Sequence, residues 1–254
     1  MQRRKFIQIC VAGPAANAAC AAAQAHAADS TAAQAQPTTP AQRNAPVQRA
    51  YARARLVDRH GQPIKARSLK ANHNYVFNYP YESTPCFLLN LDKALTAKVA
   101  LATADGRAYE WTGGVGPKQS IVAYSAICAH KLAYPTKQVS FISYRADARV
   151  GSAATSRARV IACCADRSVY DPASGARVVS GPAPQPLATI VLEYDAATDE
   201  LFAVGTFGGE KFDEFFAKYE FKLALDVGAR ARERVADAAV LSDLTAFSTQ
   251  TAQC

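Results

Sequence analysis

Residues 126–132 read Ala126-Ile-Cys-Ala-His-Lys-Leu132, and residues 162–171 read Ala162-Cys-Cys-Ala-Asp-Arg-Ser-Val-Tyr-Asp171. Each stretch follows an apolar run that is typical of a strand, so we expect its polar residues on a loop at the end of that strand. A Cys-x-His pair on one loop and a Cys pair on another offer thiolate and imidazole, donors that iron and zinc accept. These two stretches therefore decide the expected fold and its chemistry.

A proline-rich motif follows the second stretch. Residues 181–187 read Gly181-Pro-Ala-Pro-Gln-Pro-Leu187. Proline fixes φ and glycine permits the turn, so this motif predicts a rigid loop. Two strand-like runs come after it, at residues 188–194 and 201–204.

The ordered set of motifs resembles the Rieske [2Fe-2S] proteins over about residues 120–206, roughly a third of the chain. In that family the first box is Cys-x-His, here Cys128 and His130. The second box is Cys-x-x-His followed by Ser-x-Tyr-Asp, and the proline-rich motif comes next. The resemblance implies a [2Fe-2S] cluster in which two thiolates hold one iron and two imidazoles hold the other.

The resemblance also implies roles for residues around the cluster. Ser168 and Tyr170 would donate hydrogen bonds toward the sulfurs, which raises the reduction potential. Gly181 and Pro182 begin the loop that would cover the cluster and exclude water.

The second box departs from the family because it lacks the histidine. Counted back from the Ser-x-Tyr motif, the missing imidazole falls on Asp166, three residues after Cys163. Counted forward from Cys164 it falls on Arg167, a register favoured by the single base that separates Arg and His codons. Asp166 could bind through oxygen, whereas the cationic Arg167 is a poor ligand. The predicted ligand set is therefore Cys128, His130, Cys163, Cys164, Asp166 and Arg167.

The sequence also predicts how the other cysteines are paired or buried. Many Rieske proteins join the two ligand loops by a disulfide, and the corresponding positions here look like Ala133 and Ala165. We therefore expect the loops to be held by packing and by the proline motif alone, with no partner for the spare thiol of the Cys163–Cys164 pair. Cys254 is expected to be exposed and either reactive or cross-linking, and Cys86 to lie in the core.

The remaining pattern predicts a mainly β fold. Short alternating or apolar runs at residues 74–79, 85–90, 121–127, 137–144 and 157–162 predict strands. The expected architecture is an antiparallel Rieske-type β-domain with the cluster-binding loops at one end. Residues 212–219 have helical spacing and predict a short C-terminal helical segment whose aromatic face packs on the core.

The N-terminus predicts export. Arg3 and Arg4 before Phe6 resemble a twin-arginine signal, and Ala25-His-Ala27 offers a cleavage site. We therefore expect a leader at 1–27, a flexible linker rich in Ala, Gln, Pro and Thr at 28–50, and a folded domain at 51–254. Within it, the cluster-binding part is expected at about 120–190 and a helical tail at about 210–254.

Charge limits the partners that we expect. The formal net charge is +8, but the basic residues are scattered and form no aromatic-interleaved stripe, so no nucleic-acid partner is predicted. A mildly basic surface suits an acidic redox protein or anionic lipid. We expect a cytochrome or a larger oxidoreductase subunit as the partner. The predicted location is the periplasm, with anchoring to the outer face of the inner membrane through the N-terminus left open.

The predicted function is single-electron transfer within a respiratory or periplasmic oxidoreductase, resembling a quinol:cytochrome c reductase or a molybdenum oxidase. The chain would be an electron-transfer subunit rather than a catalyst on its own. One alternative is a cluster-free protein of the same fold with a structural or assembly role. Another is a single iron or zinc ion bound by Cys128, His130, Cys163 and Cys164.

Overall fold

Strand β3, Pro85–Asn90, lies in the larger sheet and buries both of its faces. Phe87 and Leu89 belong to one apolar core, and Cys86 and Leu88 belong to another. Successive side chains of a strand point to opposite faces of the sheet, so burial on both faces requires an uninterrupted apolar run. The stretch Pro85–Asn90 has that run, and the strand predicted there is confirmed.

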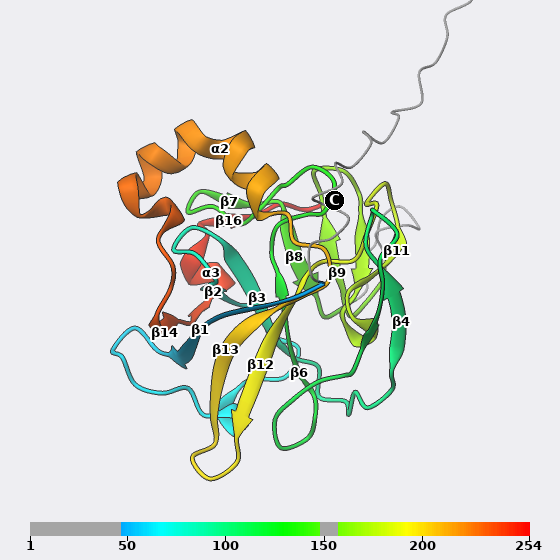
Figure 1. Ribbon diagram of the computed structural model, residues 1–254, viewed down its shortest axis with the longest axis vertical. Helices are drawn as coiled ribbons and strands as arrows, with labels where there is room; N and C mark the ends of the chain where they lie inside the picture. The colour runs from blue at the N-terminus through cyan, green and yellow to red at the C-terminus, as the bar shows by residue number, and fades with distance from the viewer. Residues whose placement is uncertain (1–46, 148–156) are drawn as a thin grey trace, which may run out of the picture. The chain divides into compact units, whose positions relative to one another are not determined.

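The computed structural model describes residues 47–147 and 157–254. Its larger sheet has eight strands, drawn in Figure 1. In spatial order they are β14 (Asp237–Val240), β1 (Gln48–Val57), β13 (Glu200–Phe207), β12 (Thr189–Asp195), β6 (Ile121–Ser125), β3, β2 (Tyr75–Asn78) and β15 (Ser242–Asp243). Neighbouring strands are antiparallel except for β1 and β14, which are parallel.

A smaller antiparallel sheet packs against the larger one. Its strands are β11 (Arg177–Ser180), β10 (Val169–Asp171), β9 (Val160–Cys163) and β8 (Ile142–Arg145). The core between the sheets includes Phe87 and Tyr124 from the larger sheet and Ile161 and Tyr170 from the smaller. The thiols of Cys128 and Cys163 lie in this same core, so the loops that carry them start from well-packed strands.

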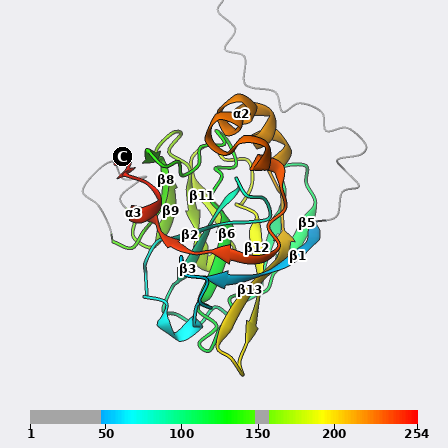
Figure 2. The same ribbon diagram turned by 90° about the vertical axis from the view of Figure 1, so that its left-hand side faces the viewer.

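The remaining elements are short, apart from one helix. Two further strand pairs are β4 (Val99–Ala102) with β5 (Ala108–Trp111), and β7 (Val139–Ser140) with β16 (Gln250–Thr251). The 3₁₀ turns are η1 (Ala66–Ser68), η2 (Pro172–Ser174) and η3 (Gly228–Arg232), and α3 spans Leu244–Phe247. Helix α2 spans Phe212–Val227, and in Figure 1 and Figure 2 it lies at the end opposite the tip of the β12–β13 hairpin.

Helix α2 packs on the first of the two loops singled out in the sequence. Its buried residues include Phe215 and Phe216, which lie in one apolar cluster with Ile127 and Tyr134 of that loop. The ring centroids of Tyr134 and Phe215 are 4.8 Å apart in an edge-to-face arrangement. The predicted helix is confirmed, and its aromatic stripe packs on the core as expected.

The mainly β, antiparallel fold with a C-terminal helix is confirmed, but the boundaries differ at both ends. Strand β1 begins at Gln48, inside the stretch predicted as linker. The tail predicted as helical returns to the sheets after α2 as β14, β15 and β16, because each pairs with an edge that the preceding chain leaves open. The predicted leader and nearly all of the linker lie outside the described residues. Among the residues that the structure describes, no helix is long and apolar enough to span a membrane.

Candidate metal centre

Two loops meet at the site, and each closes with the same pair of backbone hydrogen bonds. In the first loop the Cys128 N–H donates to the Ala133 carbonyl at 2.9 Å, and the Leu132 N–H donates to the Cys128 carbonyl at 3.0 Å. In the second loop the Cys163 N–H donates to the Ser168 carbonyl, and the Arg167 N–H donates to the Cys163 carbonyl, both at 2.8 Å. Each cysteine thus opens a loop that closes five residues later.

This repeated form favours the register of the second box that begins at Cys163. Leu132 and Arg167 both stand four residues after the cysteine of their loop and have a left-handed backbone, at φ 58° and 63°. Cys163 therefore corresponds to Cys128, and the side chain of its loop that lies against His130 is that of Asp166. The Arg167 register is not supported, because the Arg167 side chain is exposed and no donor group of the site contacts it in the described structure.

The donor atoms of the site lie around Asp166. The Sγ atoms of Cys128 and Cys163 and a carboxylate oxygen of Asp166 all lie within 4.8 Å of one another. His130 Nδ1 lies 3.0 Å from Asp166 Oδ2, which is itself 3.3 Å from Cys128 Sγ. The thiols are fully buried, the Asp166 side chain is 2 % exposed, and the His130 side chain is 36 % exposed. The imidazole is thus the part of the site that reaches solvent.

The two thiols are not equivalent. A hydrogen bond from Cys163 lowers the pKa of Cys128 to about 7 against the opposing effect of burial, and the Tyr170 hydroxyl and the backbone N–H groups of His130 and Lys131 lower it further. The same hydrogen bond, with burial, raises the pKa of Cys163. The opposite directions of the two pKa shifts make Cys128 the more acidic thiol of the pair, and the thiolate is the form that metals bind.

Asp166 is held as a carboxylate. Burial alone would raise the pKa of Asp166, but hydrogen bonds from the Ser168 N–H, from Cys128 and Cys163 and from His130 outweigh burial and lower it. The Ser168 N–H contact is 2.9 Å long. A buried anion fixed in this way is a competent oxygen ligand for a cation.

Tyr170 and Ser168 support the site in different ways. The Tyr170 hydroxyl accepts from the Ala129 N–H at 3.1 Å and lies 3.3 Å from Cys128 Sγ, so its own proton is available to that sulfur. Ser168 Oγ instead accepts from the Ala183 N–H at 3.1 Å. Tyr170 therefore has the contact that the sequence predicted, whereas Ser168 ties the proline-rich loop to the second ligand loop.

The proline-rich loop lies directly on the second ligand loop at Gly181. Gly181 has φ +89°, and a Cβ there would lie 2.5 Å from Ser168 Cα and 2.6 Å from the Arg167 carbonyl oxygen. Only glycine permits that approach. Pro182, the next residue, is exposed, so this part of the loop borders the second ligand loop rather than filling the site.

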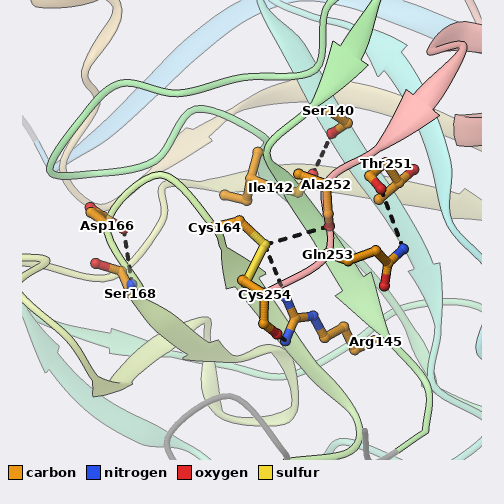
Figure 3. The surroundings of a disulfide bond; sticks show 10 residues. All are labelled: Ser140, Ile142, Arg145, Cys164, Asp166, Ser168, Thr251, Ala252, Gln253 and Cys254. Carbon is orange, nitrogen blue, oxygen red and sulfur yellow. Dashed lines mark hydrogen bonds between the residues drawn. A yellow bond between two sulfur atoms is a disulfide. The ribbon is translucent and has the colours of Figure 1, made fainter. Parts of the chain in front are cut away.

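Cys164 is bonded to Cys254, which corrects three predictions. The disulfide joins residues 90 apart in sequence with a Cα–Cα distance of 5.5 Å, and Figure 3 shows its surroundings. Cys164 is therefore not a thiolate ligand in this state, the spare thiol of the pair has a partner, and the second loop does not rely on packing alone. The cross-link expected as one alternative for Cys254 is confirmed. Arg145 Nη2 donates to both sulfurs, at 3.1 Å to Cys164 and 2.7 Å to Cys254.

The other cysteine outside the site behaves as the sequence predicted. Cys86 is a free, fully buried thiol whose Sγ donates to the Tyr79 carbonyl at 2.9 Å. Burial raises the pKa of Cys86, so it is an inert core residue rather than a ligand.

The donor set of two thiols, one imidazole and one carboxylate has the chemistry of an iron–sulfur centre with mixed ligands. The spacing also fits a single ion. With bonds of about 2.3 Å to sulfur and about 2.0 Å to oxygen or nitrogen, tetrahedral donors stand roughly 3.3 to 3.8 Å apart, close to the separations seen around Asp166.

Sequence reasoning missed Arg145, and it did not identify Cys164 as the partner of Cys254. Arg145 is 2 % exposed and lies on β8, next to the strand that ends at Cys163. The odd thiol of the Cys163–Cys164 pair and the lone Cys254 were a usable signal for the disulfide, but two cysteines 90 residues apart carry no local spacing rule.

The matches among solved structures include a Rieske protein. No protein-family model matches the chain. The structure is similar to the soluble domain of the Rieske protein II (SoxF) from Sulfolobus acidocaldarius, with 25% sequence identity and a TM-score of 0.42. The match covers 63% of this chain and 82% of that chain. At this TM-score the similarity leaves the function to be inferred from the site itself.

Proposed function

We propose that this chain is an electron-transfer protein whose iron–sulfur centre is held by Cys128 and Cys163 on one side and by His130 and Asp166 on the other. The observation that carries the proposal is the meeting of two loops of identical hydrogen-bonded form, each bringing one buried thiol and one second donor. A [2Fe-2S] centre bound there would supply single-electron chemistry. A carboxylate in place of the second imidazole adds negative charge, which lowers the reduction potential.

The residues around such a centre would have different roles. The thiols are buried away from water, and Tyr170 would stabilise added charge on the Cys128 sulfur. His130 is the exposed donor, so an electron partner would approach the site at this ring. Its Nδ1 already faces Asp166, which leaves Nε2 for contact with solvent or with the partner.

The proposed function also has a location in the cell and a redox partner. The protein would be exported to the periplasm and serve a respiratory or periplasmic oxidoreductase, resembling a quinol:cytochrome c reductase or a molybdenum oxidase, through a cytochrome or larger redox subunit. The twin-arginine motif at Arg3-Arg4 supports export, and so does the Cys164–Cys254 disulfide, because disulfides persist in oxidising compartments. The net charge of +8 favours an acidic partner or an anionic membrane surface.

A second candidate is a single metal ion. The separation of at most 4.8 Å among the donor atoms of Cys128, Cys163 and Asp166 favours it, since one ion needs its donors closer together than two bridged irons do. Iron in that position would also transfer electrons, whereas zinc has no redox chemistry and would make the site structural.

The test is purification of the full chain from a host with working iron–sulfur assembly, followed by iron, sulfide and zinc counts and an EPR spectrum of the reduced protein. Two irons with two sulfides support the cluster. One iron without sulfide, or one zinc, supports the single ion. A metal-free protein from that preparation would exclude electron transfer and leave the cluster-free structural role.

Two variants then identify the fourth ligand. Asp166→His replaces the carboxylate by an imidazole, so we expect an altered EPR spectrum and a higher reduction potential. Arg167→His places an imidazole at the exposed neighbouring position and is the matched control, for which we expect the wild-type spectrum. The reverse pattern would show that the register derived from the loop hydrogen bonds is wrong.

A further inference from the structure

Residues 248–254, which we call the clasp, run along the chain that leaves the first ligand loop. The Thr249 N–H donates to the Lys137 carbonyl at 2.9 Å, and the Gln250 N–H donates to the Gln138 carbonyl at 3.1 Å. The Ala252 N–H donates to the Ser140 carbonyl at 2.8 Å. These bonds include the parallel pairing of β16 with β7, which begins nine residues after His130.

The clasp is joined covalently to the second ligand loop. Cys254 forms the disulfide with Cys164, and Cys164 Sγ also contacts the Ala252 carbonyl at 3.5 Å, as Figure 3 shows. The Cys164 N–H donates to the Phe141 carbonyl at 2.6 Å, one residue beyond β7. The clasp therefore links the exit of the first ligand loop to the second ligand loop.

Cys164 lies between the two donor residues of the second loop, so a link at Cys164 restrains both of them. It follows the donor Cys163 directly and lies two residues before the donor Asp166. Holding its Cα 5.5 Å from that of Cys254 limits how far either donor can move. Arg145, buried on the strand beside Cys163, donates to both sulfurs and to the Cys254 carbonyl, so it holds the two half-cystines together.

We propose that Cys254 is a positioning residue for the metal centre, and that the Cys164–Cys254 disulfide makes this support sensitive to thiol reductants. With the disulfide formed, the second ligand loop keeps Cys163 and Asp166 at their places opposite Cys128 and His130. With the disulfide reduced, only hydrogen bonds hold the clasp and the second loop loosens. The consequence for metal retention rests on the proposed function, whereas the loosening itself does not.

The reduction needs an external dithiol. One of its thiolates attacks Cys254 Sγ, the more exposed of the two positions, and Cys164 leaves as a thiolate that takes up a proton. The second thiol of the reductant then attacks the mixed disulfide and releases Cys254 as a thiol. Two electrons and two protons pass to the protein, and the dithiol is oxidised to its disulfide.

The experiment compares the oxidised full chain with the same protein after dithiol treatment, with reduction of both cysteines verified by alkylation and mass spectrometry. The Cys164→Ser/Cys254→Ser double variant lacks the disulfide without leaving a spare thiol beside Cys163. Gln253→Ala is the matched control, since it alters the neighbouring exposed clasp residue and retains the disulfide.

Two readouts are taken on each protein. Hydrogen exchange at residues 164–168 reports the second ligand loop and needs no metal. Release of bound Co²⁺ to a chelator, followed by its thiolate absorption bands, reports the donor set. We expect faster exchange at 164–168 and release faster by about tenfold or more in the reduced and double-variant proteins, the scale on which residues that orient metal ligands usually act.

Unchanged exchange at 164–168 after complete reduction would overturn the proposal, and so would a change confined to residues 248–254. Unchanged Co²⁺ release from a loop that exchanges faster would refute the role of Cys254 in positioning the centre. If the oxidised protein binds neither Co²⁺ nor iron, the proposed function fails, and the exchange data still decide whether the disulfide holds the loop.

Discussion

The close approach of the proline-rich loop to the second ligand loop predicts that Gly181→Ala destabilises the protein by more than its backbone conformation explains. Gly181 has φ +89°, where an alanine is strained by about 1 to 2 kcal/mol. The added Cβ would also lie 2.5 Å from Ser168 Cα, whereas carbon atoms pack at about 3.5 to 4.0 Å. Since the nearest atoms belong to the backbone, no side-chain rotation relieves the contact.

The magnitude follows from these two effects. Overpacking of this kind costs about 1 to 3 kcal/mol, so the total expected loss is about 2 to 5 kcal/mol. If the loop moves away instead, the hydrogen bond from the Ala183 N–H to Ser168 Oγ is lost, which costs about 1 kcal/mol and exposes the second ligand loop. For a domain of this size the total corresponds to a Tm lower by about 4 to 20 °C.

The matched control is Gly106→Ala, because Gly106 has a similar φ of +82° and no atom within 4 Å of the site of its Cβ. We expect it to cost only the backbone strain of about 1 to 2 kcal/mol. Equilibrium denaturation of both variants, compared at unchanged m-value, separates the contact from the strain. Equal losses for the two variants would refute the packing of the proline-rich loop on Ser168.

Three further predictions concern the site. Cys254→Ser opens a disulfide that spans 90 residues, so we expect a loss of up to about 4 to 5 kcal/mol in denaturant unfolding, and no further loss when a reductant is added to the variant. Tyr170→Phe removes a donor to Cys128 and should raise the pKa of that thiol above its value of about 7 in the metal-free protein, although the hydrogen bond from Cys163 remains; the pH dependence of alkylation measures this shift. Asp166 has a lowered pKa in the folded protein, so its contribution to stability is present above the ordinary carboxyl pKa of 3.8 and is lost as the pH falls through the lowered value. Asp166→Asn should therefore flatten the acid limb of a urea-midpoint profile between about pH 5 and pH 2, and an unchanged limb would contradict the assignment.

Local periodicity was enough to predict several secondary-structure elements from the sequence alone. The apolar run Pro85–Asn90 predicts its strand because a strand buried on both faces can carry few polar residues, and the aromatic spacing from Phe212 predicts the helix because 3.6 residues make a turn. The motifs also placed Cys128, His130 and Tyr170 around one site, since the residues that open and follow a ligand loop stand at fixed spacings.

The preference for Asp166 over Arg167 came from the folded arrangement of the two loops. Both registers satisfy the spacing of a Cys-x-x-ligand box, and the difference appears only when the hydrogen bonds of the second loop are seen to repeat those of the first. The left-handed backbone of Arg167 turns its side chain to solvent, and the preceding carboxylate turns inward to His130.

The disulfide of Cys164 could not be predicted from the sequence either. Its partner lies 90 residues away, at the end of a segment that reaches it by pairing with β7. A disulfide requires two Cα atoms within a few ångströms, and only the folded arrangement of distant segments sets that distance. Local spacing therefore identified the residues that could bind a metal, and the packing of distant segments decided which of them face one another.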